Sequence, residues 1–314
     1  MKKIRLALIT GGTSNEREVA LSGAAAVEAA LNPEAYIITR YDAASDIPRL
    51  ITDRHAIDFA FLVVHGENGE DGRLQGLLDL LHIPYQGSGV LGSALACNKL
   101  AAKEIFFSKG LLTPRWETFD RFTPELEALL SEKIGLPLVI KPAHGGSSLG
   151  MSIVHEKKDI LKACELCLSC GPQGLAEPYI RGRELTCAVW GDDPVEALPV
   201  IEIRPGKEFA FFDYTAKYTP GATEEICPAP IPPDTALKVQ KAAVLAHKSL
   251  YCEGYSRSDF ILRDEELYIL ETNTLPGMTK TSLLPLAART AGIPFPKLID
   301  GLIQLRLKKG RLQG

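Results

Sequence analysis

The first 95 residues alternate strand-like apolar runs with helix-like stretches, and this alternation constrains the fold more than any other feature. We expect strands at residues 4–10, 37–41 and 59–64 and helices at 16–31 and 74–81. Such alternation is typical of a parallel sheet covered by helices. Ligands of these sheets bind beside the carboxyl ends of the strands. The sequence therefore predicts an α/β fold with a binding site at that edge.

Two polar clusters lie where expected strands end, at residues 11–18 and 65–72. The first lacks the G-x-G-x-x-G spacing of a dinucleotide fingerprint, which disfavours a nicotinamide-binding oxidoreductase. Glu16 could hold a substrate ammonium group, or it could only complement the dipole of the first helical turn. His65 could orient Glu16 or a substrate, or be an ordinary turn residue.

A hairpin is expected near the C-terminus, with strands at residues 255–262 and 267–273. Side chains alternate along a strand, so a turn centred near Glu265 sets Asp259 opposite Glu271 and Arg257 opposite Asn273. Two carboxylates and an amide oxygen suit Mg²⁺. The opposite face, Phe260, Leu262, Tyr268 and Leu270, is expected to pack in a core. The alternative is an amphipathic hairpin whose polar face is merely solvated.

The middle of the chain combines lysines with a glycine-rich loop. A helix over residues 98–109 carries Lys99 and Lys103, and an apolar strand over 136–142 carries Lys141. The following loop, 144–150, has glycines and the hydroxyls of Ser147 and Ser148, which could contact phosphate oxygens. It is not a Walker A sequence, and hairpins also need glycine.

Two later segments could complete a ligand site. Glu177 and Glu184 flank an expected turn at Arg181–Gly182 and could contact an adenine amino group and ribose hydroxyls, or be ordinary turn and strand charges. Residues 209–229 form a long irregular stretch, which in a compact domain is usually a lid or binding loop. A closing helix is expected from Pro285 onward, followed by a basic, solvated tail at residues 307–311.

The length of 314 residues predicts two or three domains. The net charge of −4 argues against nucleic acid as the main partner. No apolar run reaches membrane-spanning length, and the N-terminal run resembles a first strand rather than a signal peptide, so we expect a cytoplasmic protein without membrane partners.

The seven cysteines are expected to be reduced thiols. Cys164, Cys167 and Cys170 have a C-x2-C-x2-C spacing, but an iron–sulfur site would need a fourth ligand nearby. Helical periodicity favours small apolar core positions instead.

Six stretches together resemble the D-alanine–D-alanine ligase family of the ATP-grasp superfamily, in the family's order and over essentially the whole chain. They are Gly11–Val19, His65–Gly72, Leu74–Gly76, Lys141–Met151, Asp213–Tyr218 and Glu271–Met278. The resemblance implies an ATP-grasp fold with an N-terminal Rossmann-like parallel-sheet domain. The implied divisions are an N-terminal substrate-binding domain at 1–97, a central ATP-grasp subdomain at 98–181, and a C-terminal subdomain at 182–314 with the metal site and an active-site loop.

The resemblance also implies roles for individual residues. ATP would be bound by Lys99, Lys141, Ser147, Glu177, Tyr179, Ile180, Glu184 and Lys217, although Pro178 stands where other members can carry lysine. Two Mg²⁺ ions, or Mn²⁺ in their place, would be held by Asp259, Glu271 and Asn273. The catalytic residues would be Glu16, Ser147, Tyr218, Arg257 and Gly277. The substrates would be bound by Glu16, His65, Arg257, Gly277, Ser282 and Leu283, with Glu16 at the ammonium group of the first D-alanine and Ser282 and Leu283 around the second. Tyr218 is expected to bond toward Glu16 and Ser147.

The implied reaction joins two D-alanines through a D-alanyl phosphate, for peptidoglycan precursor synthesis. Members that form an ester to D-lactate usually have phenylalanine in place of Tyr218, so the tyrosine favours the dipeptide. A homodimer is expected from the resemblance alone. The remaining alternatives are an ATP-grasp ligase for another carboxylate and amine, and a nucleotide-binding regulatory protein, which would not need the set Arg257, Asp259, Glu271 and Asn273.

Overall fold

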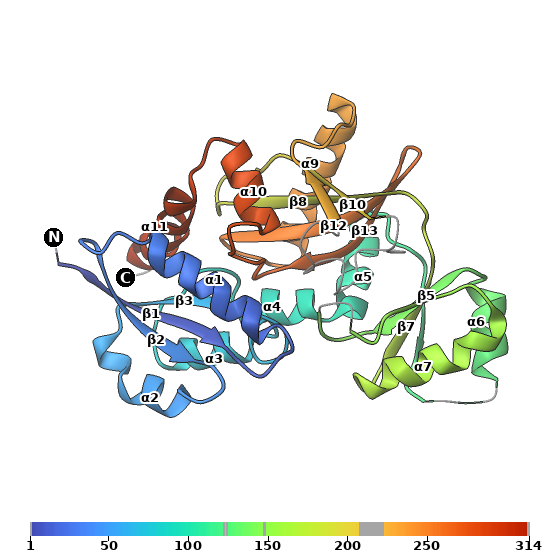
Figure 1. The fold of residues 1–314 in the computed structure, drawn as a ribbon, viewed down its shortest axis with the longest axis horizontal. Coiled ribbons are helices and arrows are strands. Elements are labelled where there is room, and N and C mark those ends of the chain that lie inside the picture. The colour runs from blue at the N-terminus through green and yellow to red at the C-terminus, as the bar shows by residue number, and fades with distance from the viewer. Residues whose placement is uncertain (1, 122, 124, 147–148, 207–222, 313–314) are drawn as a thin grey trace.

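The computed structural model describes residues 2–121, 123, 125–146, 149–206 and 223–312, which form three sheets with helices around them (Figure 1). The first sheet is parallel, with the strand order β2 (Tyr36–Asp42), β1 (Ile4–Gly11) and β3 (Phe59–Val64). Its helices are α1 (Arg17–Ala30), α2 (Ile47–Thr52) and α3 (Arg73–Leu80). Every residue of β3 is buried, as expected for a strand of a parallel sheet that is covered on both faces. The predicted parallel sheet is confirmed.

A four-stranded antiparallel sheet lies at the opposite end of the molecule (Figure 1). Its strand order is β4 (Glu117–Phe119), β7 (Gly174–Pro178), β5 (Leu138–Pro142) and β6 (Ser152–Val154). Helices α6 (Leu126–Lys133) and α7 (Ile160–Ser169) share a core with it. Cys164 and Cys167 are fully buried in that core, as the helical pattern predicted, whereas Cys170 is exposed.

The third sheet has six strands and lies between the other two (Figure 1). The order is β11 (Thr223–Ile226), β10 (Ile201–Pro205), β8 (Arg183–Trp190), β12 (Tyr255–Arg263) and β13 (Glu266–Asn273), with β9 (Glu196–Ala197) paired to β8. Helix α9 (Pro233–Ser249) packs on β8 and β12. Strand β11 falls within the stretch expected to be irregular, so that expectation is wrong for residues 223–226.

Two helices close the chain where one was expected. They are α10 (Leu283–Thr290) and α11 (Phe295–Leu312), and the expected basic tail is part of α11. Leu298, Ile299 and Ile303 of α11 share one core with the first sheet. The C-terminal segment therefore packs against the N-terminal sheet.

Helices α4 (Val90–Cys97) and α5 (Lys99–Ser108) connect the first sheet to the other two. They follow one another almost directly, with only Asn98 between them. The Asn98 side chain accepts a hydrogen bond from the Ala101 amide at 3.0 Å and so caps α5. In the described part of the chain, no helix is both long enough and apolar enough to cross a lipid bilayer.

Candidate active site

A cavity of about 1130 Å³ lies where the three sheets meet. Its wall combines the start of α1 and the loop after β3 with β5 and β7 of the four-stranded sheet and β8, β12 and β13 of the six-stranded sheet. A space of this size can hold a nucleotide together with small substrates.

The β12–β13 hairpin supplies the acidic side of the cavity. Arg257 pairs with Asn273 and Asp259 with Glu271, which confirms the predicted register. The pairing shifts between Asp259 and Phe260, so that Phe260 lies opposite Ile269. This β-bulge turns Leu270 toward the cavity, while Ile269 is buried in the core. The expectation that Leu270 packs in the core is therefore wrong.

Arg257 and Asp259 form a buried pair at the centre of this hairpin. Arg257 Nε donates to Asp259 Oδ1 at 2.9 Å and Nη2 donates to Oδ2 at 2.7 Å. Thr186 Oγ1 on β8 donates to the same Oδ1 at 2.6 Å. Burial alone would lower the pKa of Arg257, but the Asp259 carboxylate raises it, so the guanidinium is charged at every physiological pH.

Asn273 links this hairpin to the loop after β3. In the orientation that satisfies both of its polar atoms, the amide donates to Glu70 Oε1 at 3.1 Å and accepts from Arg257 Nη2 at 2.9 Å. The other Glu70 oxygen accepts from the Gly66 amide at 2.8 Å, and His65 Nδ1 lies 3.9 Å from Oε1. Glu70 therefore connects His65 to the acidic side of the cavity.

Burial and neighbouring charge act together on Glu184. Burial is the larger cause, and the Asp259 and Glu271 carboxylates add to it, so the pKa of Glu184 rises to about 8 although Arg257 acts in the opposite direction. Glu184, Asp259 and Glu271 therefore form a group of acidic side chains in this part of the cavity.

Lys99 lies at the first turn of α5, between the glycine-rich loop and the acidic strand β13. Its Nζ donates to the Gly145 carbonyl and lies 3.3 Å from Glu271 Oε2. The backbone amide of Lys99 also donates to the Ala143 carbonyl at 2.8 Å, and the Asn98 side chain contacts His144 Nε2 at 3.0 Å. These contacts fix the start of α5 against the loop.

Lys141 of β5 and Glu177 of β7 form the opposite wall. Their strands pair in the four-stranded sheet, and Lys141 Nζ lies 2.8 Å from Glu177 Oε2. The Glu177 side chain is almost fully buried, and its Oε1 lies 2.6 Å from Lys103 Nζ. Glu177 therefore has a lysine at each carboxylate oxygen and also lines the cavity.

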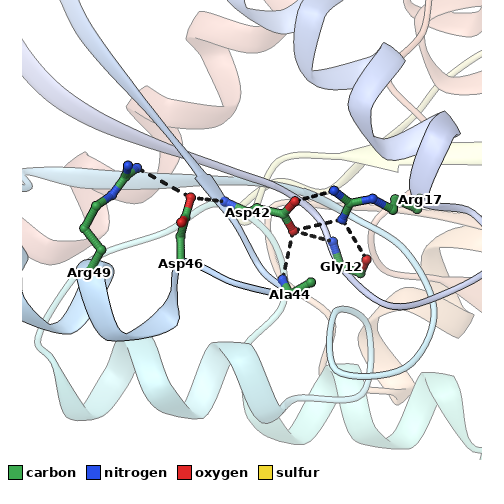
Figure 2. A network of polar contacts seen from close by, with 6 residues as sticks. All are labelled: Gly12, Arg17, Asp42, Ala44, Asp46 and Arg49. Atoms are coloured by element: carbon green, nitrogen blue, oxygen red, sulfur yellow. Dashed lines mark hydrogen bonds and ion pairs between the residues drawn. The ribbon is translucent and has the colours of Figure 1, made fainter.

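A polar network at the carboxyl ends of β1 and β2 fixes the turn next to Glu16, which lines the cavity (Figure 2). Asp42 accepts from Arg17 Nη1 at 3.0 Å and from the Gly12 and Ala44 amides at 3.2 and 2.9 Å. Arg17 also donates to the Gly12 carbonyl at 2.9 Å. The hydrogen bonds from Arg17 lower the pKa of Asp42, so the carboxylate remains charged. The turn that precedes Glu16 is therefore clamped to β2.

Gly11 is required at the start of this turn. Its φ is +73°, in the left-handed region, and a Cβ there would lie 2.5 Å from Asp42 Oδ1. A side chain at this position would displace the clamp.

The segment before α10 supplies the last wall. Ser282 Oγ accepts from the Thr279 amide at 3.0 Å and contacts Thr279 Oγ1 at 2.7 Å. A Cβ on Gly277 would lie 2.7 Å from Ser282 Oγ, so this turn leaves no room for a side chain at Gly277.

The cavity collects most of the candidate residues of the sequence analysis. Those in its wall are Glu16, His65, Lys99, Lys141, Glu177, Tyr179, Ile180, Glu184, Arg257, Asp259, Glu271, Asn273, Gly277, Ser282 and Leu283. Ser147, Lys217 and Tyr218 lie outside the described residues.

Two family models match the chain: the C-terminus of D-Ala–D-Ala ligases over residues 105–304 and the N-terminus of the same ligases over residues 42–88. The D-alanine–D-alanine ligase of Desulfotalea psychrophila is 52% identical over 99% of this chain and 97% of that protein. The chain belongs to the D-alanine–D-alanine ligase family.

Solved structures of this ligase family agree with the arrangement. The D-alanine–D-alanine ligase of Bacillus anthracis superposes with a TM-score of 0.87 at 36% identity, over 99% of this chain and 100% of that one. The same enzyme complexed with ATP gives a TM-score of 0.85 at 34% identity, over 99% of this chain and 100% of that one.

Two residues of this family member were missed by the sequence reasoning. Glu70 lies inside the polar cluster at 65–72, but only the fold shows that it reaches Asn273 across the cavity. Lys103 was noted on its helix without a role, and its partner Glu177 is 74 positions away in the sequence. Neither contact leaves a local pattern that periodicity could detect.

Proposed function

We propose that this protein joins two D-alanines into D-alanyl-D-alanine with ATP, for the synthesis of cell-wall precursors. The observation that carries the proposal is that carboxylate and lysine side chains from three sheets and their adjoining loops line one cavity. The names of the family models and of the close relatives support the same activity.

The nucleotide would lie between the four-stranded and six-stranded sheets. Lys141 and Lys99 are suited to neutralise the phosphates, and Ser147 and Lys217 are assigned the same task by the resemblance. Glu177 suits an adenine amino group, because it lines the cavity next to Tyr179 and Ile180. Glu184 suits the ribose hydroxyls. The ATP complex of the Bacillus anthracis ligase supports the choice of nucleotide.

Magnesium is the metal that the acidic wall would hold, with Asp259, Glu271 and Asn273 as ligands for two ions. Hard oxygen donors fit Mg²⁺ or Mn²⁺, and the Asp259 and Glu271 carboxylates lie opposite one another in the cavity wall. When bound, the metal would neutralise phosphate charge during transfer.

The reaction would proceed in two steps. A carboxylate oxygen of the first D-alanine attacks the γ-phosphorus, the bond to ADP breaks, and D-alanyl phosphate forms. The amine of the second D-alanine then attacks the carbonyl carbon and phosphate leaves with the carboxylate oxygen, while the amine loses a proton. Arg257 and the backbone near Gly277 would stabilise the oxyanion between these bond changes.

The remaining cavity residues would bind the amino acids. Glu16, with His65 beside Glu70, is suited to the ammonium group of the first D-alanine. Ser282 and Leu283 are suited to the second D-alanine, and Tyr218 is assigned by the resemblance to bond toward Glu16 and Ser147. We further propose the domain divisions 1–97, 98–181 and 182–314, a cytoplasmic location and a homodimer, all on the resemblance.

The test is phosphate release from Mg-ATP with D-alanine, with L-alanine, and with D-alanine plus D-lactate, the products being identified by mass. The proposal predicts release that depends on D-alanine and a D-alanyl-D-alanine product in the first and third mixtures. A D-alanyl-D-lactate product in excess would instead make the protein an ester-forming member. ATP binding without D-alanine-dependent release would assign the site to another carboxylate and amine.

A further inference from the structure

Lys103 is a buried lysine that does not reach the cavity. It lies on α5, one turn after Lys99, and its side chain has no exposed surface. Its Nζ donates to Thr113 Oγ1 at 2.8 Å and to the Pro114 carbonyl at 2.7 Å, and it lies 2.6 Å from Glu177 Oε1. The Trp116 ring centroid is 4.9 Å from the same nitrogen. All three ammonium protons therefore have a partner.

Glu177 lies between two lysines, with Lys103 on one oxygen and Lys141 on the other. Burial would raise the pKa of this carboxyl group, but the lysines outweigh it and the pKa is lowered. Burial lowers the pKa of Lys103 to about 8, which leaves it charged at neutral pH. The ion-pair triad Lys103–Glu177–Lys141 thus consists of three charged groups.

The net charge of this triad determines how strongly Lys141 attracts a phosphate group. With Glu177 alone, Lys141 would form a neutral pair whose attraction for an anion in the cavity is weak. Lys103 offsets the carboxylate from behind, so the three groups together have one net positive charge. Of the two lysines in the triad, Lys141 is the one that lines the cavity. In a buried site such charge balance acts with little screening by solvent.

We propose that Lys103 is a positioning residue for the nucleotide. It fixes Glu177 and balances its charge, and so keeps Lys141 available to the phosphates. This inference rests on the proposed ATP-binding function and adds to it a residue that touches neither ATP nor D-alanine.

A purely structural role is the competing explanation, because Lys103 also ties α5 to the 113–116 segment. Charge separates the two explanations. If Lys103 acts through Glu177, then replacing Glu177 by neutral glutamine should compensate for the loss of Lys103. If Lys103 only fills space and anchors the helix, the second substitution should add further damage.

The experiment measures the dissociation constant of ATP by calorimetry for the wild type, Lys103→Met, Glu177→Gln and the double variant. Lys103→Met is expected to weaken ATP binding by about tenfold or more. The double variant is expected to bind ATP several-fold more tightly than Lys103→Met. Steady-state kinetics should show the change in the KM for ATP, with the KM for D-alanine within about twofold of the wild type.

Lys133→Met is the matched control, because Lys133 also pairs with a carboxylate in the same part of the chain, Glu117 at 3.1 Å, but is half-exposed. It should bind ATP like the wild type. The inference would be overturned if Lys103→Met bound ATP with wild-type affinity. It would also be overturned if the double variant bound ATP no more tightly than Lys103→Met. These outcomes are read from ATP binding alone, so they are distinct from a wild-type protein that binds ATP but makes no dipeptide, which would defeat the proposed function.

Discussion

At the scale of single residues, Asp42 is the group that we expect to position Glu16 without touching a substrate. Asp42→Asn weakens the clamp to Arg17 and Gly12, whose hydrogen bonds contribute about 1 kcal/mol. We expect the KM for the first D-alanine to rise about fivefold, with the KM for ATP unchanged. Steady-state kinetics with each substrate varied in turn is the measurement.

The chain provides a matched control for this prediction at the other end of the same sheet. Arg5 and Asp58 form a similar pair at 2.6 Å, and Asp58 also accepts from the Arg5 amide at 2.8 Å. Asp58→Asn should change stability to a similar extent and leave both KM values unchanged. If the two variants raise the KM for D-alanine equally, Asp42 does not act through Glu16.

Glu271 is the residue on which the metal assignment depends most. It lies opposite Asp259 and 3.3 Å from Lys99, at the acidic wall. Glu271→Gln keeps the shape and removes the charge, so we expect kcat to fall at least about 100-fold while the melting temperature stays within a few degrees. Glu265→Gln, at the exposed turn of the same hairpin, should be fully active. Near-normal turnover of Glu271→Gln would refute the assignment.

At the scale of elements, helix α9 contains a buried histidine that couples folding to pH. His247 is buried against the six-stranded sheet, with its Nδ1 2.8 Å from Ser256 Oγ. Burial lowers the pKa of His247 to about 4, from an ordinary 6.5, although Asp192 acts in the opposite direction. Between these values the unfolded chain binds a proton that the folded chain does not.

The free energy of unfolding should therefore fall as the pH drops from about 6.5 toward 4, by up to about 1.4 kcal/mol per pH unit from this residue. Urea unfolding at pH 7, 6 and 5 measures it. His247→Gln should be less stable at pH 7 but lose less stability on acidification, whereas the exposed His55→Gln should follow the wild type. An equal pH slope in His247→Gln and the wild type would show that another group titrates.

The elements also show what local pattern can and cannot predict. The hairpin register could be predicted, because side-chain alternation and a short charged turn leave one pairing that gathers the polar groups. The β-bulge at Asp259 and Phe260 could not, since one extra residue changes no local propensity. The same limit explains why Leu270 was expected in the core and Ile269 was not.

At the scale of the whole molecule, the cavity exists only because segments far apart in the sequence meet. The parallel sheet and the polar ends of its strands were predictable from alternation. That Glu177 and Glu184 end up in two different sheets, facing one space, was not. Nor was the docking of α11 on the first sheet, where Tyr36 donates to Asp300 from 264 positions away. The roles that the motifs suggested came from resemblance rather than periodicity.

The central claim is that this shared cavity holds the carboxylate of D-alanine against the γ-phosphate of ATP. The most direct test supplies Mg-ATP with D-alanine labelled with ¹⁸O in its carboxylate and determines the isotope content of the released phosphate by mass spectrometry. An acyl phosphate passes one carboxylate oxygen to phosphate, so we predict one ¹⁸O in each phosphate for each dipeptide formed. Dipeptide formation with unlabelled phosphate would contradict the account.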